Sequence, residues 1–220
     1  MSPVTAVVVF PGTNCERDVI RALRALGGEA EAVWHRDADL SGFAGVVLPG
    51  GFAHGDYLRP GAIAATSPIM AAVRRMAGEG RPVLGICNGW QVLCEAGLLP
   101  GAHIANRDLR FICRFVEVEV VDTDTVLTST LQVGQVLRIP LNSYEGAWVD
   151  PSGEGRVVLR YRDDPNGSQG RAAAVADGRG NVVGVMPHPE RAVDHLTGST
   201  DGVPLLESYL AALERLPVHA

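Results

Sequence analysis

The chain of 220 residues contains no lysine, and all nineteen of its basic residues are arginines. A Walker-type phosphate-binding loop requires a lysine beside its glycine, and Schiff-base catalysis requires a lysine amine, so both are excluded. The Gly-x-Gly-x-x-Gly pattern of dinucleotide-binding folds is absent as well. The sequence therefore has no nucleotide-binding signature of its own.

Other absences restrict the class of protein further. No apolar run is long enough to span a bilayer, and the first residues lack the basic region of a signal peptide. The formal net charge of −6 argues against nucleic acid or an anionic membrane as the main partner. The four cysteines form no Cys-x-x-Cys pair, so we expect no metal site and free thiols in a reducing, cytoplasmic environment.

Alternating strand and helix patterns fill the first half of the chain. Short apolar runs predict buried strands, and apolar residues spaced by three or four predict amphipathic helices. Predicted strands lie at residues 7–10, 30–34, 46–48 and 82–86, and predicted helices at residues 16–26, 67–78 and 88–96. Such alternation is typical of an α/β protein with a parallel sheet.

The pattern changes after residue 112. Val116, Val118 and Val120 alternate with glutamates, which predicts a strand with one solvated face. Further strands are predicted at residues 133–139 and 157–161, a hairpin at 172–175 and 182–185, and a last helix at 204–216. We expect one three-layer α/β domain over residues 1–220, with a mostly parallel sheet, an antiparallel extension, and an active site at the carboxyl ends of the parallel strands.

Cys87 stands between the predicted strand at 82–86 and the helix that follows it. Glycines lie two residues before and two residues after it, at Gly85 and Gly89, which is the cysteine form of the nucleophile-elbow pattern. Such a turn lifts the side chain clear of the sheet, and a helix N-terminus favours the thiolate. A buried structural cysteine in a tight turn is the alternative. The two glycines and the strand–helix context favour a catalytic nucleophile.

A thiolate nucleophile needs a partner that manages protons, and His188 is the candidate. It follows an apolar strand and lies between two prolines, which favour an extended backbone. Glu190 then projects to the same side as His188 and can fix its tautomer, so the two would complete a catalytic triad with Cys87. The alternative is a rigid turn in which Glu190 pairs with Arg191.

Acyl transfer also needs hydrogen-bond donors for an oxyanion. The pair Gly50 and Gly51 follows the predicted strand at 46–48 and lets backbone N–H groups approach a ligand. The second expected donor is the N–H of Asn88, the residue after the nucleophile. By itself the glycine pair is also consistent with a plain turn.

The remaining cysteines and histidines carry weaker signals. Cys15 follows a strand but lacks flanking glycines, so we expect it to pack at the edge of the site. Cys94 and Cys113 are expected in the core. The histidines other than His188 have no partner motif, so we expect them on the surface or in loops: His35, His54, His103, His195 and His219.

These motifs together resemble the class I, triad-type glutamine amidotransferases. Several segments resemble, more narrowly, the glutaminase subunits of phosphoribosylformylglycinamidine synthase: residues 11–15, 49–59, 85–91, 106–111, 166–168 and 186–191. The motifs Cys-Asn-Gly-x-Gln and Pro-Gly-Gly-Phe are specific to those subunits, whereas Pro-His-Pro-Glu is shared more widely. The similarity runs from about residue 6 to the C-terminal helix.

The resemblance implies a flavodoxin-like three-layer α/β/α sandwich that hydrolyses L-glutamine to glutamate and ammonia. It implies Cys87 as nucleophile, His188 as acid and base, and Glu190 as the residue that orients the histidine. Oxyanion donation and glutamine binding are implied at the positions that match the family's motifs: Gly51, Phe52, Asn88 and Gln91.

The resemblance also implies partners. In that family a large synthetase subunit uses ATP and Mg²⁺ to convert formylglycinamide ribonucleotide to formylglycinamidine ribonucleotide in de novo purine biosynthesis, and a small dimeric subunit bridges the complex. No cofactor is therefore expected in this chain. One departure is that Ser143 and Tyr144 stand where the family usually carries His-Gly, in a loop that in related amidotransferases holds the backbone end of glutamine.

Two other classes of protein remain open at this point. A stand-alone cysteine hydrolase or deglycase on a similar fold also uses an elbow cysteine, but usually with other placements of the histidine and the acid. An interaction subunit that has lost the chemistry would keep the fold alone. The intact set of Cys87, His188 and Glu190 argues against the second of these.

Overall fold

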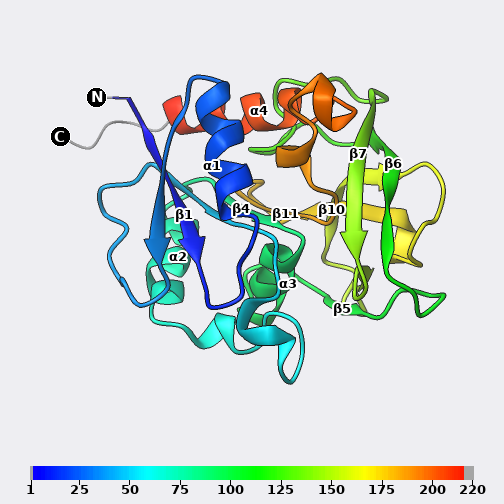
Figure 1. Ribbon diagram of the computed structural model, residues 1–220, viewed down its shortest axis with the longest axis horizontal. Coiled ribbons are helices and arrows are strands. Elements are labelled where there is room, and N and C mark those ends of the chain that lie inside the picture. Colours follow the sequence, from blue (N-terminus) through cyan, green and yellow to red (C-terminus); the bar gives the residue numbers. More distant parts are fainter. Residues whose placement is uncertain (1, 216–220) are drawn as a thin grey trace.

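The computed structural model describes residues 2–215, which form a central sheet with helices on both faces (Figure 1). The strand order in this sheet is β2-β1-β3-β4-β11-β10-β9-β6-β7, and β5 and β8 form a separate pair. The strands are β1 (Val4–Val9), β2 (Glu29–Trp34), β3 (Gly45–Leu48), β4 (Val83–Ile86), β5 (Ala102–Ile104), β6 (Ile112–Val120), β7 (Val136–Ser143), β8 (Ala147–Val149), β9 (Arg156–Tyr161), β10 (Ala172–Ala176) and β11 (Val182–Val185).

Four α-helices in residues 2–215 complete three layers. They are α1 (Glu16–Ala25), α2 (Ile69–Gly78), α3 (Asn88–Glu95) and α4 (Val203–Glu214). Helices α1 and α4 lie on one face of the sheet, and α2 and α3 lie on the other (Figure 1). Within the described part of the chain, no helix has the length and apolar character needed to cross a membrane.

The pairing of the strands confirms the predicted α/β architecture. Neighbours from β2 through β11 pair in parallel, and β10, β9, β6 and β7 add to the sheet in antiparallel fashion. The predicted hairpin is the β10–β11 pair. Strand β7 begins at Val136 rather than at residue 133, and the short β5–β8 pair was not predicted. The predicted end of the last helix at Leu216 lies outside the described residues.

The burial of four strands agrees with the hydrophobic patterns of their sequences. Every residue of β3, β4 and β11 is buried, because parallel strands in the middle of the sheet carry helices on both faces. Strand β6 instead buries Val116, Val118 and Val120 and leaves the glutamates between them outside the core, as its alternation predicts. The continuous apolar runs therefore mark the centre of the sheet.

The register of β4 with β11 positions the site. Gly85 pairs with Gly184 and Ile86 pairs with Val185, so the two strands end side by side and in the same direction. Gly184 has no side chain because the ring of Trp90, on α3, occupies the space where a Cβ would lie. The helix that follows Cys87 is therefore packed directly on the strand that leads to His188.

We expect Gly184→Ala to destabilise the chain by about 1–3 kcal/mol, because the added methyl group must displace the fully buried ring of Trp90. Urea unfolding followed by tryptophan fluorescence measures this. The control is Gly178→Ala, where an added Cβ meets nothing within 4 Å. Equal unfolding midpoints for the two variants would contradict the packing argument.

Candidate active site

Cys87 occupies a strained turn between β4 and α3. Its backbone angles are φ 49° and ψ −108°, a combination that residues with side chains rarely adopt. A Cβ on Gly85 would lie 2.7 Å from the backbone of Gly89, and a Cβ on Gly89 would collide with the carbonyl oxygen of Leu48. The backbone N–H of Cys87 donates to the carbonyl of Val185 at 2.7 Å. The two glycines and the contact with β11 therefore hold the turn that the sequence pattern predicts.

His188 and Glu190 form a buried hydrogen-bonded pair just beyond the end of β11. The distance from His188 Nδ1 to Glu190 Oε1 is 2.7 Å, and the side chains are 3% and 0% exposed. The backbone N–H of His188 donates to the carbonyl of Pro140 in β7, which anchors the histidine to the antiparallel part of the sheet. Glu190 therefore fixes the ring through Nδ1, so Nε2 is the ring nitrogen that this bond leaves available.

Electrostatics favour the protonated form of His188. Burial would lower its pKa, but the carboxylate of Glu190 and the neighbouring sulfurs of Cys87 and Cys15 act in the opposite direction. Together these interactions raise the pKa of His188 well above its ordinary value. The histidine is therefore prepared to hold a proton beside the sulfur of Cys87.

These groups open into one cleft of about 480 Å³. The predicted site residues that line it are Cys87, His188, Gly51, Phe52 and Gln91. Asn88 and Glu190 do not line the cleft; they are buried and form hydrogen bonds with the lining residues Gln91 and His188, respectively. The cleft is large enough for a substrate with the size of an amino acid.

The backbone N–H groups that could bind an oxyanion differ in whether they already have an acceptor. The N–H of Phe52 donates to the carbonyl of Gly12 at 3.0 Å, so Phe52 faces the cleft only with its half-exposed ring. The N–H of Asn88 belongs to the first turn of α3, where no intrahelical acceptor exists. Gly51 has φ 151°, and a Cβ there would lie 2.8–2.9 Å from the backbone of Gly12, Thr13 and Asn14. The available geometry favours Gly51 and Asn88 as the pair of donors.

A chain of side-chain amides continues from α3 into the cleft. Asn88 Nδ2 donates to Gln91 Oε1 at 2.8 Å and to Asp56 Oδ1 at 3.2 Å. Gln91 Nε2 donates to the carbonyl of Glu145 at 2.7 Å, and Asn88 Oδ1 accepts from the N–H of Ala53. The network fixes Gln91 and connects α3 with two loops around Cys87.

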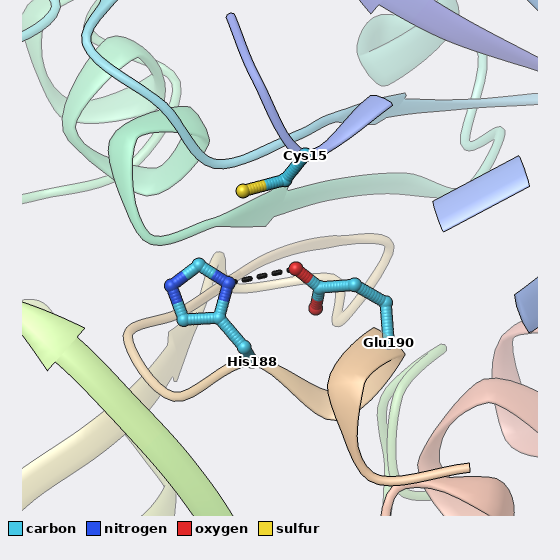
Figure 2. A group of neighbouring side chains, drawn as sticks. All are labelled: Cys15, His188 and Glu190. Carbon is cyan, nitrogen blue, oxygen red and sulfur yellow. Dashed lines mark hydrogen bonds and ion pairs between the residues drawn. The ribbon is translucent and has the colours of Figure 1, made fainter. Parts of the chain in front are cut away.

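Cys15 lies deeper in the site than the sequence suggests. It is 2% exposed and lines the cleft. Its sulfur, a ring nitrogen of His188 and a carboxylate oxygen of Glu190 all lie within 4.8 Å of one another (Figure 2). Arg191 donates to Cys15 Sγ at 3.2 Å and forms an ion pair with Asp18. This arrangement disfavours a metal ion, because a guanidinium already contacts the sulfur and Nδ1 of the histidine is engaged by Glu190.

Several side chains differ from their predicted surroundings. Cys113 is exposed rather than in the core, because it begins a strand that is buried only further along. His35 is buried rather than on the surface, and its ring contacts Ser67 Oγ at 3.1 Å. The prediction for His219 lies outside the described residues. Asp56 also lines the cleft, although its signal in the sequence was only its place in the motif that carries Gly51.

Comparison with known proteins identifies the class. A family model described as a CobB/CobQ-like glutamine amidotransferase domain matches residues 2–202. The chain therefore belongs to the glutamine amidotransferases, as the fold and the site of Cys87, His188 and Glu190 suggest.

Comparison with individual proteins shows which family of glutamine amidotransferases the chain belongs to. Two relatives are named phosphoribosylformylglycinamidine synthase subunit PurQ. The one from Rubrobacter xylanophilus is 53% identical, over 93% of this chain and 96% of its own length. The one from Mycobacterium tuberculosis is 51% identical, over 97% of this chain and 99% of its own length. A chain of the solved structure of PurLQS from Thermotoga maritima is 44% identical, with a TM-score of 0.93 over 97% of this chain and 100% of its own length. Within its class the chain belongs to the PurQ family.

We expect Glu190→Gln to leave His188 neutral at pH 7. The variant keeps an acceptor for Nδ1 but removes the charge that offsets burial, so the pKa of His188 falls. Because the folded-state pKa is raised in the parent chain, the bound proton stabilises the fold; this contribution is full below the ordinary histidine pKa and is lost progressively as the pH rises through the raised value.

The ¹⁵N shifts of the His188 ring, followed through a pH titration, measure the protonation state directly. Glu154→Gln, at an exposed position, is the matched control and should leave the titration unchanged. An imidazolium that persists at pH 7 in Glu190→Gln would show that Glu190 is not the main source of the raised pKa.

Proposed function

We propose that this chain is the glutaminase subunit of a phosphoribosylformylglycinamidine synthase and releases ammonia from L-glutamine. The observation that carries the proposal is a single cleft that contains an elbow cysteine and a histidine bonded to a buried glutamate. The PurQ family supplies the substrate and the reaction. In this proposal Cys87, His188 and Glu190 are the catalytic residues.

The first half of the reaction forms a covalent intermediate. The Cys87 thiolate attacks the side-chain amide carbon of glutamine, and the developing oxyanion accepts hydrogen bonds from the N–H groups of Gly51 and Asn88. His188 then gives its proton to the departing nitrogen. The C–N bond breaks, ammonia leaves, and a glutamyl thioester remains on Cys87.

The second half regenerates the enzyme. His188, now neutral, takes a proton from a water molecule as that water attacks the thioester carbonyl. The C–S bond breaks, glutamate leaves, and the thiolate and imidazolium are restored. Glu190 keeps the histidine in one tautomer in both halves, and loss of one oxyanion donor in such sites costs about 10²–10³ in rate.

The ammonia must reach an acceptor that this chain does not bind. The sequence has no nucleotide-binding motif, so in this proposal ATP and Mg²⁺ bind to a large synthetase subunit. A small bridging subunit belongs to the same complex. The complex works in the cytoplasm. The relatives are named as subunits of this synthase, and a homologous chain occurs in a structure named PurLQS.

The rim of the cleft suits a docked partner. Tyr57 and Leu58 lie between the lining residues Asp56 and Pro60 in sequence, and Leu109 lies two residues before the lining residue Phe111. Their side chains are 74%, 85% and 68% exposed, respectively. Leu58 and Leu109 also have positive φ angles of 70° and 51°, which are strained for a bulky residue. A strained backbone that presents apolar side chains to water is consistent with a surface that the synthetase subunit covers.

We expect a glutamine-mimicking alkylating agent to label Cys87, because this thiol lies in the strained turn at the N-terminus of α3 and lines the cleft beside His188. Cys15 also lines the cleft, but its sulfur is contacted by the guanidinium of Arg191. Mass spectrometry of the modified peptide identifies the residue, and excess glutamine should block the labelling. Cys87→Ala should abolish labelling and glutamine hydrolysis, whereas Cys113→Ser, at an exposed position outside the cleft, should change neither. Labelling of Cys15 alone, or none with the synthetase subunit present, would contradict the proposed role of Cys87.

We expect Leu58→Asn to weaken assembly with the synthetase subunit about tenfold, because it removes an apolar contact at the rim. Asparagine tolerates a positive φ better than leucine does, so the free chain should fold at least as stably as the parent. Binding is measured by titration of labelled subunits, and hydrolysis by the free chain is the internal control. Unchanged binding would show that the partner does not cover this part of the rim.

A further inference from the structure

Cys15 is a buried thiol on the wall of the cleft that the reaction steps do not use. It stands at the N-cap position of α1. The side chain of an N-cap residue usually bonds the first backbone N–H groups of its helix, but the side chain of Cys15 forms no such bond. Its sulfur is instead directed toward His188, which follows β11 (Figure 2).

The backbone fixes Cys15 next to the histidine. The N–H of Cys15 donates to the carbonyl of Gly50 at 3.2 Å, and a bridge between Thr13 and Gly51 joins the same two loops. A Cβ on Gly50 would lie 2.7 Å from His188 Cε1 and 3.2 Å from Cys15 Sγ. The ring of His188 and the sulfur of Cys15 therefore both pack into the space that the absent side chain of Gly50 leaves.

Two hydrogen bonds orient the thiol. The S–H of Cys15 donates to Asn14 Oδ1 at 3.2 Å, and the sulfur accepts from Arg191 Nη2 at 3.2 Å. Arg191 is itself paired with Asp18 on α1 at 3.2 Å. Because the proton of the thiol is bonded to Asn14, the electron-rich side of the sulfur is left for Arg191 and His188.

The titratable groups beside His188, in the part of the chain that the structure describes, come from three segments. Glu190 follows β11, Cys87 precedes α3 and Cys15 precedes α1. Burial lowers the pKa of His188, but the carboxylate of Glu190 and the sulfurs of Cys87 and Cys15 together raise it well above its ordinary value. The cation of Arg191 contacts the sulfur of Cys15 and is already paired with a carboxylate of α1.

We propose that Cys15 is a positioning residue for the glutaminase reaction, whose oriented sulfur holds the ring of His188 so that its proton points to the departing nitrogen. Glu190 bonds one ring nitrogen, but a single hydrogen bond does not stop the ring from tilting about it. The sulfur within 4.8 Å of a ring nitrogen and the backbone of Gly50 against Cε1 restrict that tilt. This inference rests on the proposed function and adds to it a residue that acts through the histidine.

Two variants of Cys15 test the proposal. Cys15→Ala removes the sulfur. Cys15→Ser is the second variant, since serine is a favoured N-cap residue and should keep α1 folded even if alanine does not. Cys113→Ser is the matched control, because Cys113 is exposed and does not line the cleft. All are assayed as full chains in complex with the synthetase subunit, and urea unfolding shows that each variant is folded.

The assay compares L-glutamine with the γ-methyl thioester of L-glutamate. Attack by Cys87 gives the same glutamyl thioester from both substrates, but methanethiolate leaves without a proton, whereas ammonia needs one from His188. In Cys15→Ala, kcat/KM for glutamine should fall about tenfold, because part of the roughly 10²–10⁴-fold gain from proton transfer is lost. The value for the thioester should fall less than about threefold. Cys15→Ser should lose activity with the same selectivity, and Cys113→Ser should match the parent.

The pH profile is a second readout, which a residue that only packs would not change. The high-pH limb of kcat/KM for glutamine reports the loss of the proton from His188. The sulfur of Cys15 raises the pKa of His188, so its removal lowers that pKa. The high-pH limb should therefore move to lower pH in Cys15→Ala and stay in place in Cys113→Ser.

Three results overturn the inference: an equal loss with both substrates, no loss with either, or a high-pH limb that stays where it is in the parent. Failure of the proposed function has a different signature. In that case the parent complex hydrolyses neither substrate, and Cys87 is not labelled by the glutamine-mimicking agent.

Discussion

The parallel pairing of β4 with β11 is the constraint on which the site depends. Two segments about a hundred residues apart in sequence end side by side, because Gly85 pairs with Gly184 and Ile86 with Val185. The backbone bond from Cys87 to Val185 and the ring of Trp90 over Gly184 then fix the elbow and its helix to the neighbouring strand. A shift of register by one residue would turn the side chains of β11 to the opposite face and move the histidine away from the thiol.

Charge in the site is arranged in two separate places. At one end the buried Glu190 compensates a protonated His188 next to Cys87, and Arg191 contacts the sulfur of Cys15. Toward the mouth, Asp56 and Glu145 have no cation among the described residues. The first arrangement is complete within the fold, and in the proposed function it serves acid–base chemistry.

Sequence reasoning was most successful where the information is local. The elbow glycines, the apolar runs of β3 and β4, and the alternation in β6 each depend on residues within one short segment, and the structure has all of them as expected. It failed where surroundings are set by distant segments. Cys113 is exposed and His35 is buried, and the short β5–β8 pair has no pattern of its own long enough to detect.

The sequence by itself determined the class of fold, the elbow cysteine and the candidate histidine and glutamate, because backbone periodicity and turn chemistry are encoded by neighbouring residues. Only the tertiary structure decided that Cys15 contacts Arg191, and that Asp56, Asn88, Gln91 and Glu145 form one network. Those contacts join loops far apart along the chain. Their geometry follows from how strands order in the sheet and how helices pack on it, which no single segment specifies.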